Sequence, residues 1–168
     1  MATLVLTVIG DDRAGLVSAL ADVVSAHGGN WSRSQLAELS GKFAGIVEVE
    51  VDDARSSELA DALAPLAGLL DVTVHAGAVA EPSSGEAIAF EVVGNDRPGI
   101  VQEITAVLRD HRVSIDRFES DLVEAPMSGG GLFRASVQAH VDDAATVDSV
   151  VAALHALAGE LMVDLEIS

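Results

Sequence analysis

Gly10-Asp11-Asp12-Arg13-Ala14-Gly15-Leu16-Val17 decides the fold, because it returns 84 residues later as Gly94-Asn95-Asp96-Arg97-Pro98-Gly99-Ile100-Val101. The register then holds over the residues that follow: Leu20 matches Ile104, Val24 matches Leu108, His27 matches His111, Trp31 matches Ile115 and Arg33 matches Arg117. One chance motif would not stay in register so far. The sequence therefore predicts a chain built from two diverged copies of one unit.

The second half of each copy also matches, at a larger offset. Phe43 and Val47 correspond to Phe133 and Val137, 90 residues later. The additional residues of copy two fall at 125–131, a turn-rich stretch where an insertion costs little loop entropy. We predict a longer hairpin there.

Each copy opens with a strand followed by a helix. Short apolar runs at 4–9 and 88–93, rich in Val and Ile, predict buried strands. The next apolar residues have the i, i+4, i+7, i+8 spacing of a helix that lies on a core. They are Leu16, Leu20, Val23 and Val24 in copy one, and Ile100, Ile104, Val107 and Leu108 in copy two.

A hairpin, a second helix and a last strand complete each copy. Residues 31–39 and 115–123 are predicted to be extended, and apolar and polar residues alternate strictly over 43–51 and 133–141. That alternation is typical of an antiparallel sheet covered on one face only. The paired aspartates Asp52-Asp53 and Asp142-Asp143 are predicted to cap the second helix.

The predicted fold class is therefore α+β, with two ferredoxin-like βαββαβ units whose antiparallel sheets carry helices on one face. We expect the first domain at 1–79, a linker at 80–86 and the second domain at 87–168.

The amino-acid composition narrows the range of possible functions. The 168 residues include 27 Asp and Glu against 9 Lys and Arg, for a formal charge of −18, and aromatic residues make up 3%. Such a chain repels a phosphate backbone and has few rings to stack on bases, which argues against direct nucleic-acid binding. There is no cysteine for a disulfide or a thiolate metal site, and no apolar run near the roughly 20 residues of a membrane span. Met1 leads directly into a strand pattern with no basic leader, so we expect a cytoplasmic location and no membrane association.

The repeated loop between the first strand and first helix of a βαββαβ unit resembles the signature loop of the ACT domain, an amino-acid-binding regulatory module. Two ACT-type units that account for nearly the whole chain are similar to the glycine cleavage system transcriptional repressor family. The chain departs from the pattern at Ala14, where the family often has Pro, and in the longer hairpin of copy two.

The resemblance implies sheets that pair edge to edge, with an amino-acid effector held where the loop of one unit meets a neighbouring unit. The first N–H groups of a helix are unpaired and lie at the positive end of its dipole, so they suit an α-carboxylate. Glycines let a ligand approach the backbone, and Asp or Asn oxygens accept from an α-ammonium group. The predicted ligand-binding residues are Gly10, Asp11, Asp12, Arg13, Ala14, Gly15, Leu16 and Asn30 in copy one, and Gly94, Asn95, Asp96, Arg97, Pro98, Gly99, Ile100 and Ser114 in copy two.

A purely structural interpretation of the same residues stays open. Asp12 and Asp96 would then cap their helices, Pro98 would only fix φ in the first turn, and the arginines would pair with nearby carboxylates.

Other kinds of site are set aside. The glycine spacing of a P-loop is present, but Leu16 and Val17 stand where Lys and Ser or Thr are needed. The histidines have no metal-ligand spacing, and His27 and His111 are predicted to interact with the last-turn carbonyls of equivalent helices. Trp31 is expected to pack in the core. We predict no catalytic residues, no metal and no cofactor.

The sequence thus predicts a regulatory protein that senses a small amino acid such as glycine or serine and acts through protein contacts, without being an enzyme. In the family it resembles, the partner is a LysR-type transcriptional activator, so a co-regulator that does not itself touch DNA is expected, as a homodimer. The alternative is a ligand-free assembly module whose sheet edges build homo- or hetero-oligomers. A small enzyme with a site formed across a subunit interface ranks third.

Overall fold

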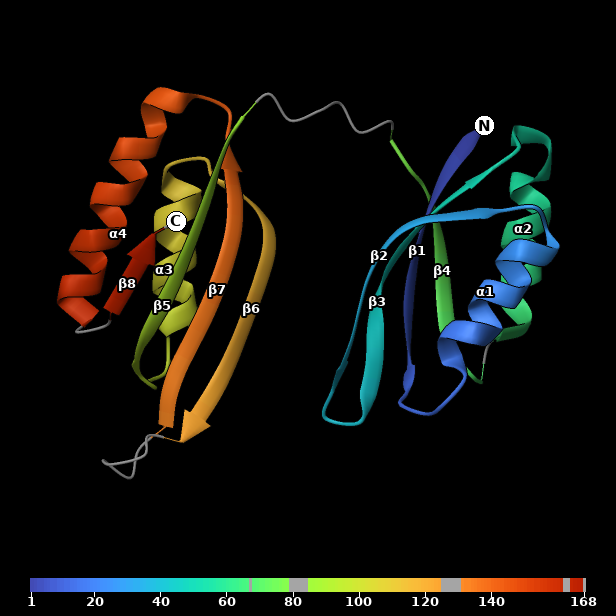
Figure 1. Cartoon of the computed structure of the whole chain (residues 1–168), viewed down its shortest axis with the longest axis horizontal. Helices are drawn as coiled ribbons and strands as arrows, with labels where there is room; N and C mark the ends of the chain where they lie inside the picture. The colour runs from blue at the N-terminus through green and yellow to red at the C-terminus, as the bar shows by residue number, and fades with distance from the viewer. Residues whose placement is uncertain (67, 79–84, 125–130, 162–163, 168) are drawn as a thin grey trace. The chain divides into compact units, whose positions relative to one another are not determined.

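The computed structural model describes residues 1–66, 68–78, 85–124, 131–161 and 164–167. Backbone contacts divide the chain into two units, Met1–Ala80 and Glu81–Ser168 (Figure 1). Most of the predicted linker and of the predicted insertion at 125–131 lies outside the described residues.

The first unit folds as a strand, a helix, a hairpin, a helix and a strand. Its elements are β1 (Ala2–Asp11), α1 (Leu16–Ala26), β2 (Asn30–Leu39), β3 (Lys42–Val51), α2 (Ser56–Leu63) and β4 (Asp71–Ala76), with 3-10 turns η1 (Asp53–Arg55) and η2 (Ala64–Leu66) on either side of α2. The sheet has the order β2-β3-β1-β4, and every neighbouring pair is antiparallel.

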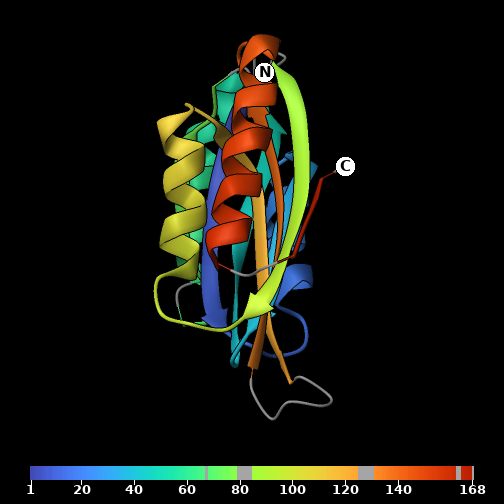
Figure 2. The same cartoon turned by 90° about the vertical axis from the view of Figure 1, so that its left-hand side faces the viewer.

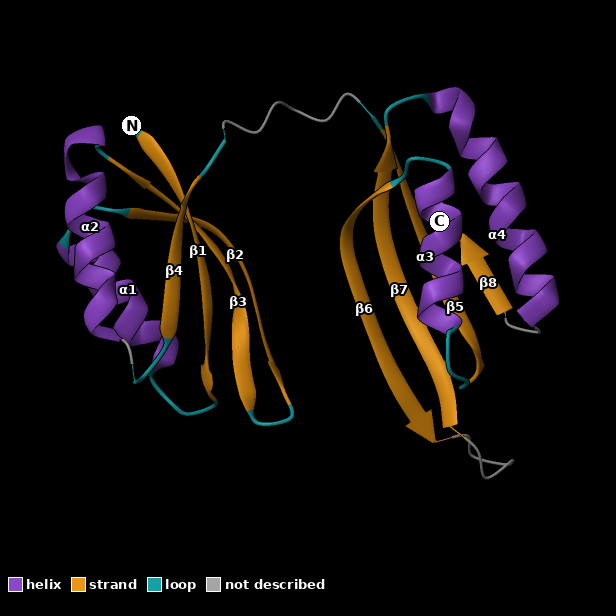
Figure 3. Cartoon of the chain, turned by 180° about the vertical axis from the view of Figure 1, so that it is seen from behind, coloured by secondary structure: helices purple, strands orange, loops and turns teal. Residues whose placement is uncertain are grey.

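The second unit repeats this order. It consists of β5 (Glu86–Asn95), α3 (Ile100–Asp110), β6 (Ser114–Glu124), β7 (Gly131–Val141), the 3-10 turn η3 (Ala144–Thr146), α4 (Val147–Leu161) and β8 (Asp164–Ile167). Its sheet has the order β6-β7-β5-β8, again antiparallel throughout. In both units the helices lie on one face of the sheet (Figure 3), and α3 and α4 pack side by side (Figure 2). The predicted fold class is confirmed.

Each unit has a core of its own between the helices and one sheet face. In the first unit, alternate residues of β1 (Leu4, Leu6 and Val8) meet the stripe Leu16, Leu20 and Val24 of α1. The equivalent stripe of α3 is Ile100, Ile104 and Leu108. The predicted helical stripes are therefore confirmed, except that Val23 and Val107 lie at their partly buried margins. Trp31 is also partly buried against the first core, as expected.

The aspartate caps predicted for the second helix of the first unit are wrong. Asp52 precedes η1 and its side chain makes no capping hydrogen bond, while the Asp53 carboxylate accepts from the Met1 ammonium at 3.1 Å. The chain enters α2 through a 3-10 turn, in which the Arg55 N–H donates to the Asp52 carbonyl at 2.8 Å. Because the backbone itself closes this turn, no side-chain cap is needed there.

The two equivalent histidines end α1 and α3 in the same way. The Nδ1 of His27 lies 2.8 Å from the Val23 carbonyl oxygen, and that of His111 lies 2.9 Å from the Val107 carbonyl oxygen. Each ring thus donates to a carbonyl of the last helical turn, which also accepts the backbone N–H of the same histidine at 3.3 Å. The structural role predicted for both histidines is confirmed.

The residues that follow these histidines show a contrast between the copies. Both helices end in a Schellman motif, in which the chain turns through a left-handed residue. That residue is Gly28 in the first unit, with φ 71°, but Arg112 in the second, with φ 56°. The motif is complete around Arg112, because Val113 N–H donates to Leu108 and Arg112 N–H to Arg109, at 2.9 and 3.0 Å. Arginine therefore occupies a left-handed position for which glycine is the better residue.

We expect Arg112→Gly to stabilise the second unit by about 0.5–1 kcal/mol. The relief of the left-handed strain outweighs the greater entropy of glycine in the unfolded chain. None of the described residues hydrogen bonds or pairs with the Arg112 guanidinium, so little is lost with the side chain. Urea unfolding followed by far-UV circular dichroism measures the change, and a lower midpoint for the variant would contradict it.

The matched variant is Gly28→Ala, which we expect to destabilise the first unit by about 1 kcal/mol. A Cβ at this position also meets Arg55 Nη1 at 2.5 Å, although that side chain end can move. Fluorescence of Trp31, which belongs to the first unit, follows the unfolding. Unchanged stability would mean that the left-handed backbone at this position carries no strain for alanine.

Candidate functional site

The two repeated loops occupy equivalent places. Each connects the end of the central strand β1 or β5 to the first helix of its unit, and each is tied by its backbone to the neighbouring hairpin. Asp12 N–H donates to the Gly41 carbonyl at 2.9 Å, and Asp96 N–H donates to the Gly131 carbonyl at 3.0 Å. The loops are therefore positioned by the sheet and its hairpin.

A left-handed glycine starts each helix. Gly15 has φ 91° and Gly99 has φ 90°, and their carbonyls accept the first helical hydrogen bonds, from Ala19 at 2.9 Å and Glu103 at 3.0 Å. A Cβ added to Gly15 would meet no atom within 4 Å, so crowding does not exclude a side chain. The backbone conformation is what requires glycine here, and the close approach of a ligand stays a prediction.

The capping role considered for Asp12 and Asp96 is wrong. No side chain makes a capping hydrogen bond at the start of α1 or α3. Pro98 does not act in the first turn either, because α3 begins two residues later, at Ile100. The first N–H groups of both helices thus have no side-chain acceptor among the described residues, although the Ile100 N–H donates to the Arg97 carbonyl at 3.5 Å, and they lie at the positive end of the helix dipole.

The arginines of the two loops make different contacts. Arg13 Nη2 donates to the Gly68 carbonyl at 3.0 Å, which connects the loop to the segment before β4. Arg97 instead pairs with Glu103 in the first turn of α3. The structural interpretation, in which the arginines pair with carboxylates, therefore holds for Arg97 and not for Arg13.

The charges beside the loops also differ. The end of β1 pairs with the start of β3, which brings Asp11 opposite Lys42, and the two side chains form an exposed ion pair. The hydrogen bond and charge of Lys42 hold the pKa of the Asp11 carboxyl below its ordinary value. In the second unit the equivalent residues are Asn95 and Leu132, which are neutral.

A small open hollow of about 200 Å³ adjoins the loop of the first unit. Gly10 and Asp11 line it together with residues that sequence reasoning missed, which are Lys42, Gly68 and Asp71 among others. Strand pairing brings them there, because Lys42 lies opposite Asp11 and Asp71 opposite Ile9. The signal for Lys42 was its place as the single lysine at the start of a predicted strand, but its partner depends on the strand register.

Two of the predicted ligand-binding residues lie away from the rest. Residues 10–16 and 94–100 gather at the start of α1 and α3, whereas Asn30 and Ser114 open β2 and β6, just after the other end of these helices. Each helix has 11 residues and is therefore about 16 Å long. Within one unit, Asn30 or Ser114 does not join the loop.

The described residues contain no group of three or more His, Cys, Asp and Glu side chains that would hold a metal ion. No helix in the described part of the chain is long and apolar enough to cross a membrane.

Comparison with known proteins identifies the family to which the chain is similar. The ACT domain family matches residues 2–77 and again residues 88–159. Among curated proteins, the glycine cleavage system transcriptional repressor of Escherichia coli is 27% identical over 162 residues, which cover 94% of this chain and 85% of that protein.

Solved structures agree on the fold. The crystal structure of an unknown protein from Galdieria sulphuraria matches with a TM-score of 0.89 and 27% identity, covering 99% of this chain and 97% of that one. A candidate glycine cleavage system transcriptional repressor matches with a TM-score of 0.70 and 18% identity over 99% of this chain and 96% of that one, a likeness of fold alone. The two matched ranges correspond to the two units, and the chain therefore belongs to the ACT domain family, with two ACT domains in tandem.

Proposed function

We propose that this chain is an amino-acid-sensing regulatory protein of the glycine cleavage repressor type, whose loops at 10–16 and 94–100 bind a small zwitterion such as glycine or serine. The observation that carries the proposal is the uncapped start of α1 and α3. Unpaired N–H groups at a helix start receive a carboxylate, and the exposed acceptors of Asp12, Asn95 and Asp96 suit the ammonium group of the same ligand.

The two loops are unequal in this proposal. In the first, the Asp11 carboxylate is already paired with Lys42, which leaves Asp12, without a side-chain partner in the described part of the chain, as its available acceptor. In the second, neither Asn95 nor Asp96 has a side-chain partner among the described residues. An ammonium group therefore finds two available acceptors in the second loop without breaking an ion pair, so we infer that the second loop binds the effector more tightly.

Regulation would pass through protein contacts. The curated relative is named a transcriptional repressor, yet a chain of charge −18 does not favour contact with DNA. We propose that effector binding in the cytoplasm changes the association of a homodimer with a protein partner, a LysR-type activator in the family that the sequence resembles. No catalytic role is part of the proposal, and the second candidate remains a ligand-free assembly module.

A thermal-unfolding screen against amino acids tests ligand binding. Glycine or serine at about 100 times its dissociation constant adds about 2.7 kcal/mol, which raises the melting temperature by several degrees for a chain of this size. Ethanolamine and glycolate are the control ligands, because each lacks one charged group of the zwitterion. We expect no shift with either. No shift with any amino acid would favour the assembly module instead.

The variants Asp96→Ala and Asp12→Ala distinguish the contributions of the two loops to effector binding. Loss of a charge-assisted hydrogen bond to the ammonium group costs about 1.5–3 kcal/mol, so we expect Asp96→Ala to weaken binding roughly tenfold to a hundredfold, measured by titration calorimetry. Asp12→Ala should change the tighter site by less than twofold. The reverse order would assign the tighter site to the first loop, and unchanged binding in both variants would place the effector elsewhere.

A further inference from the structure

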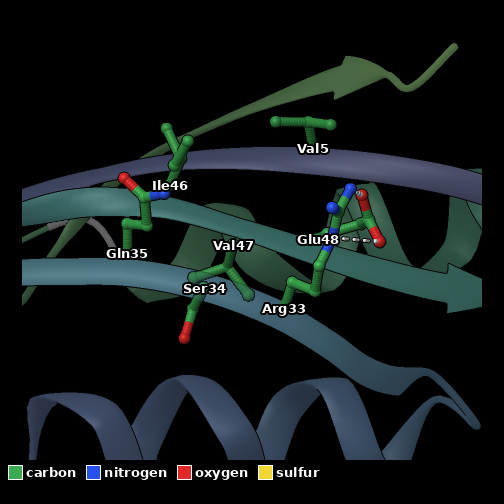
Figure 4. A pocket seen from close by; sticks show the side chains of 7 residues that line it. All are labelled: Val5, Arg33, Ser34, Gln35, Ile46, Val47 and Glu48. Atoms are coloured by element: carbon green, nitrogen blue, oxygen red, sulfur yellow. Dashed lines mark hydrogen bonds and ion pairs between the residues drawn. The ribbon is translucent and has the colours of Figure 1, made fainter. Parts of the chain in front are cut away.

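The sheet of the first unit has a face that its own helices do not cover. On that face, β1, β2 and β3 form an open hollow of about 480 Å³. Figure 4 shows Val5, Gln35, Ile46 and the Arg33–Glu48 pair on the side of the sheet opposite the helix, whereas Ser34 points towards it. These outward side chains form the uncovered face of the first unit.

The centre of the uncovered face carries no charge. The strand register aligns Gln35, Ile46, Thr7 and Thr73 in one row across the four strands. Ile46 is 48% exposed, and Ile9, two residues beyond Thr7 on β1, is 50% exposed. An outward position on a one-sided antiparallel sheet is normally polar, so two exposed isoleucines there are unexpected.

The second unit shows that the fold does not need an isoleucine at the place of Ile46, whereas Ile9 corresponds to the apolar Val93. The equivalent row of its sheet is Glu119, Ser136 and Glu91. The same architecture therefore accommodates a serine and two glutamates at the places of Ile46, Gln35 and Thr7. The exposed isoleucine at position 46 therefore needs a cause other than folding.

The ion pair beside Ile46 provides both signs of charge. Arg33 Nη2 donates to Glu48 Oε2 at 2.6 Å and Arg33 Nε donates to Glu48 Oε1 at 3.3 Å, with the Arg33 side chain 71% exposed. Exposed Glu50 on β3 and Asp71 on β4 lie on the same face towards the ends of their strands, but the pair beside Ile46 is itself balanced in charge. It is complementary to itself, because a two-fold axis places the Arg33 of one copy near the Glu48 of another.

Charge also restricts where two copies can touch. Each chain carries −18, so two copies repel except where a surface has little net charge. The row through Ile46 meets that condition, whereas the equivalent row of the second unit places Glu91 and Glu119 on both sides of Ser136.

We propose that the uncovered face of the first unit, centred on Ile46, is the surface through which two copies of this chain associate about a two-fold axis. Ile46 and Val5 of both copies lie at the centre of the contact, and Arg33 and Glu48 form exchanged ion pairs around it. This proposal does not depend on the effector or on the free edge of β2.

Sedimentation equilibrium of the full chain measures the association, with Thr7→Glu/Ile46→Ser as the test variant. The variant copies residues that the second unit already carries at these positions, and thermal unfolding checks that it folds. We expect the dimer dissociation constant to rise at least about tenfold, since burial of an exposed isoleucine is lost and two like charges are opposed. Val101→Ser, at a 40% exposed valine on α3, is the control and should leave the constant unchanged.

Mixed charge variants identify the surface itself. Arg33→Glu gives a face with two acidic residues and Glu48→Arg gives one with two basic residues, so each should weaken its own dimer. Mixed in equal amounts, they should form a heterodimer, detected by native mass spectrometry. A wild-type chain that stays monomeric at high concentration overturns the proposal. So does a dimer that tolerates Thr7→Glu/Ile46→Ser, or a mixture of the charge variants with no excess of heterodimer.

Discussion

The start of the first helix in each unit is the constraint on which the candidate site depends. A glycine with φ near 90° turns the chain from β1 or β5 into the helix, and its carbonyl accepts the first helical hydrogen bond. The turn brings in no capping side chain, and the loop before it is fastened to the hairpin through Asp12 or Asp96. Among the described residues, the first N–H groups of the helix therefore have no side-chain acceptor, at a place that the sheet has already fixed. Any other residue in place of Gly15 or Gly99 would have to adopt a conformation that costs it roughly 1–2 kcal/mol.

Periodicity and repetition were sufficient to predict the architecture. The two copies of one motif predicted two units, and the 3.6-residue stripe beginning at Leu16 and the alternation over 43–51 predicted which faces are buried. Strand register could not be predicted from the sequence. A β-bulge between Trp31 and Arg33 shifts β2 by one residue, so that Trp31 faces the core while Arg33 lies outward and pairs with Glu48. No composition rule predicts a bulge at that point, and without it the residues of β2 would face the opposite way. The contact between Lys42 and Asp11 was missed for the same reason.

Comparison of the copies separates what the fold needs from what each surface does. Positions that pack the core stay apolar in both units, as in Leu20 and Ile104 or Val24 and Leu108. The surface positions differ between the two units, and residues that contact each other differ together. An ion pair of Asp11 and Lys42 becomes Asn95 and Leu132, so both partners change together. One helix ends at the left-handed Gly28 and the other at the strained Arg112. A duplicated fold can therefore keep one scaffold while its two loops and its two sheet faces acquire different properties.

The loop and the uncovered face of the first unit share their strands. β1 contributes Val5 and Ile9 to the face and Asp11 to the loop, and β3 begins at Lys42 and carries Ile46 four residues later. The Asp12–Gly41 hydrogen bond ties the loop to the hairpin of the same sheet. An effector changes association only if it binds the free and the associated chain with different affinities, and a coupling of about 1–3 kcal/mol is typical. A ligand that separates Asp11 from Lys42 acts on β1 and on β3, the strand that carries Ile46. Binding at the loop therefore reaches the uncovered face through the backbone of a single sheet. In the second unit, Asn95 and Leu132 stand at the places of Asp11 and Lys42 and form no such ion pair, and the sheet carries glutamates where the first carries Thr7 and Gln35. Coupling through a sheet face is therefore expected of the first unit, even though the second loop offers the ligand more unpaired acceptors.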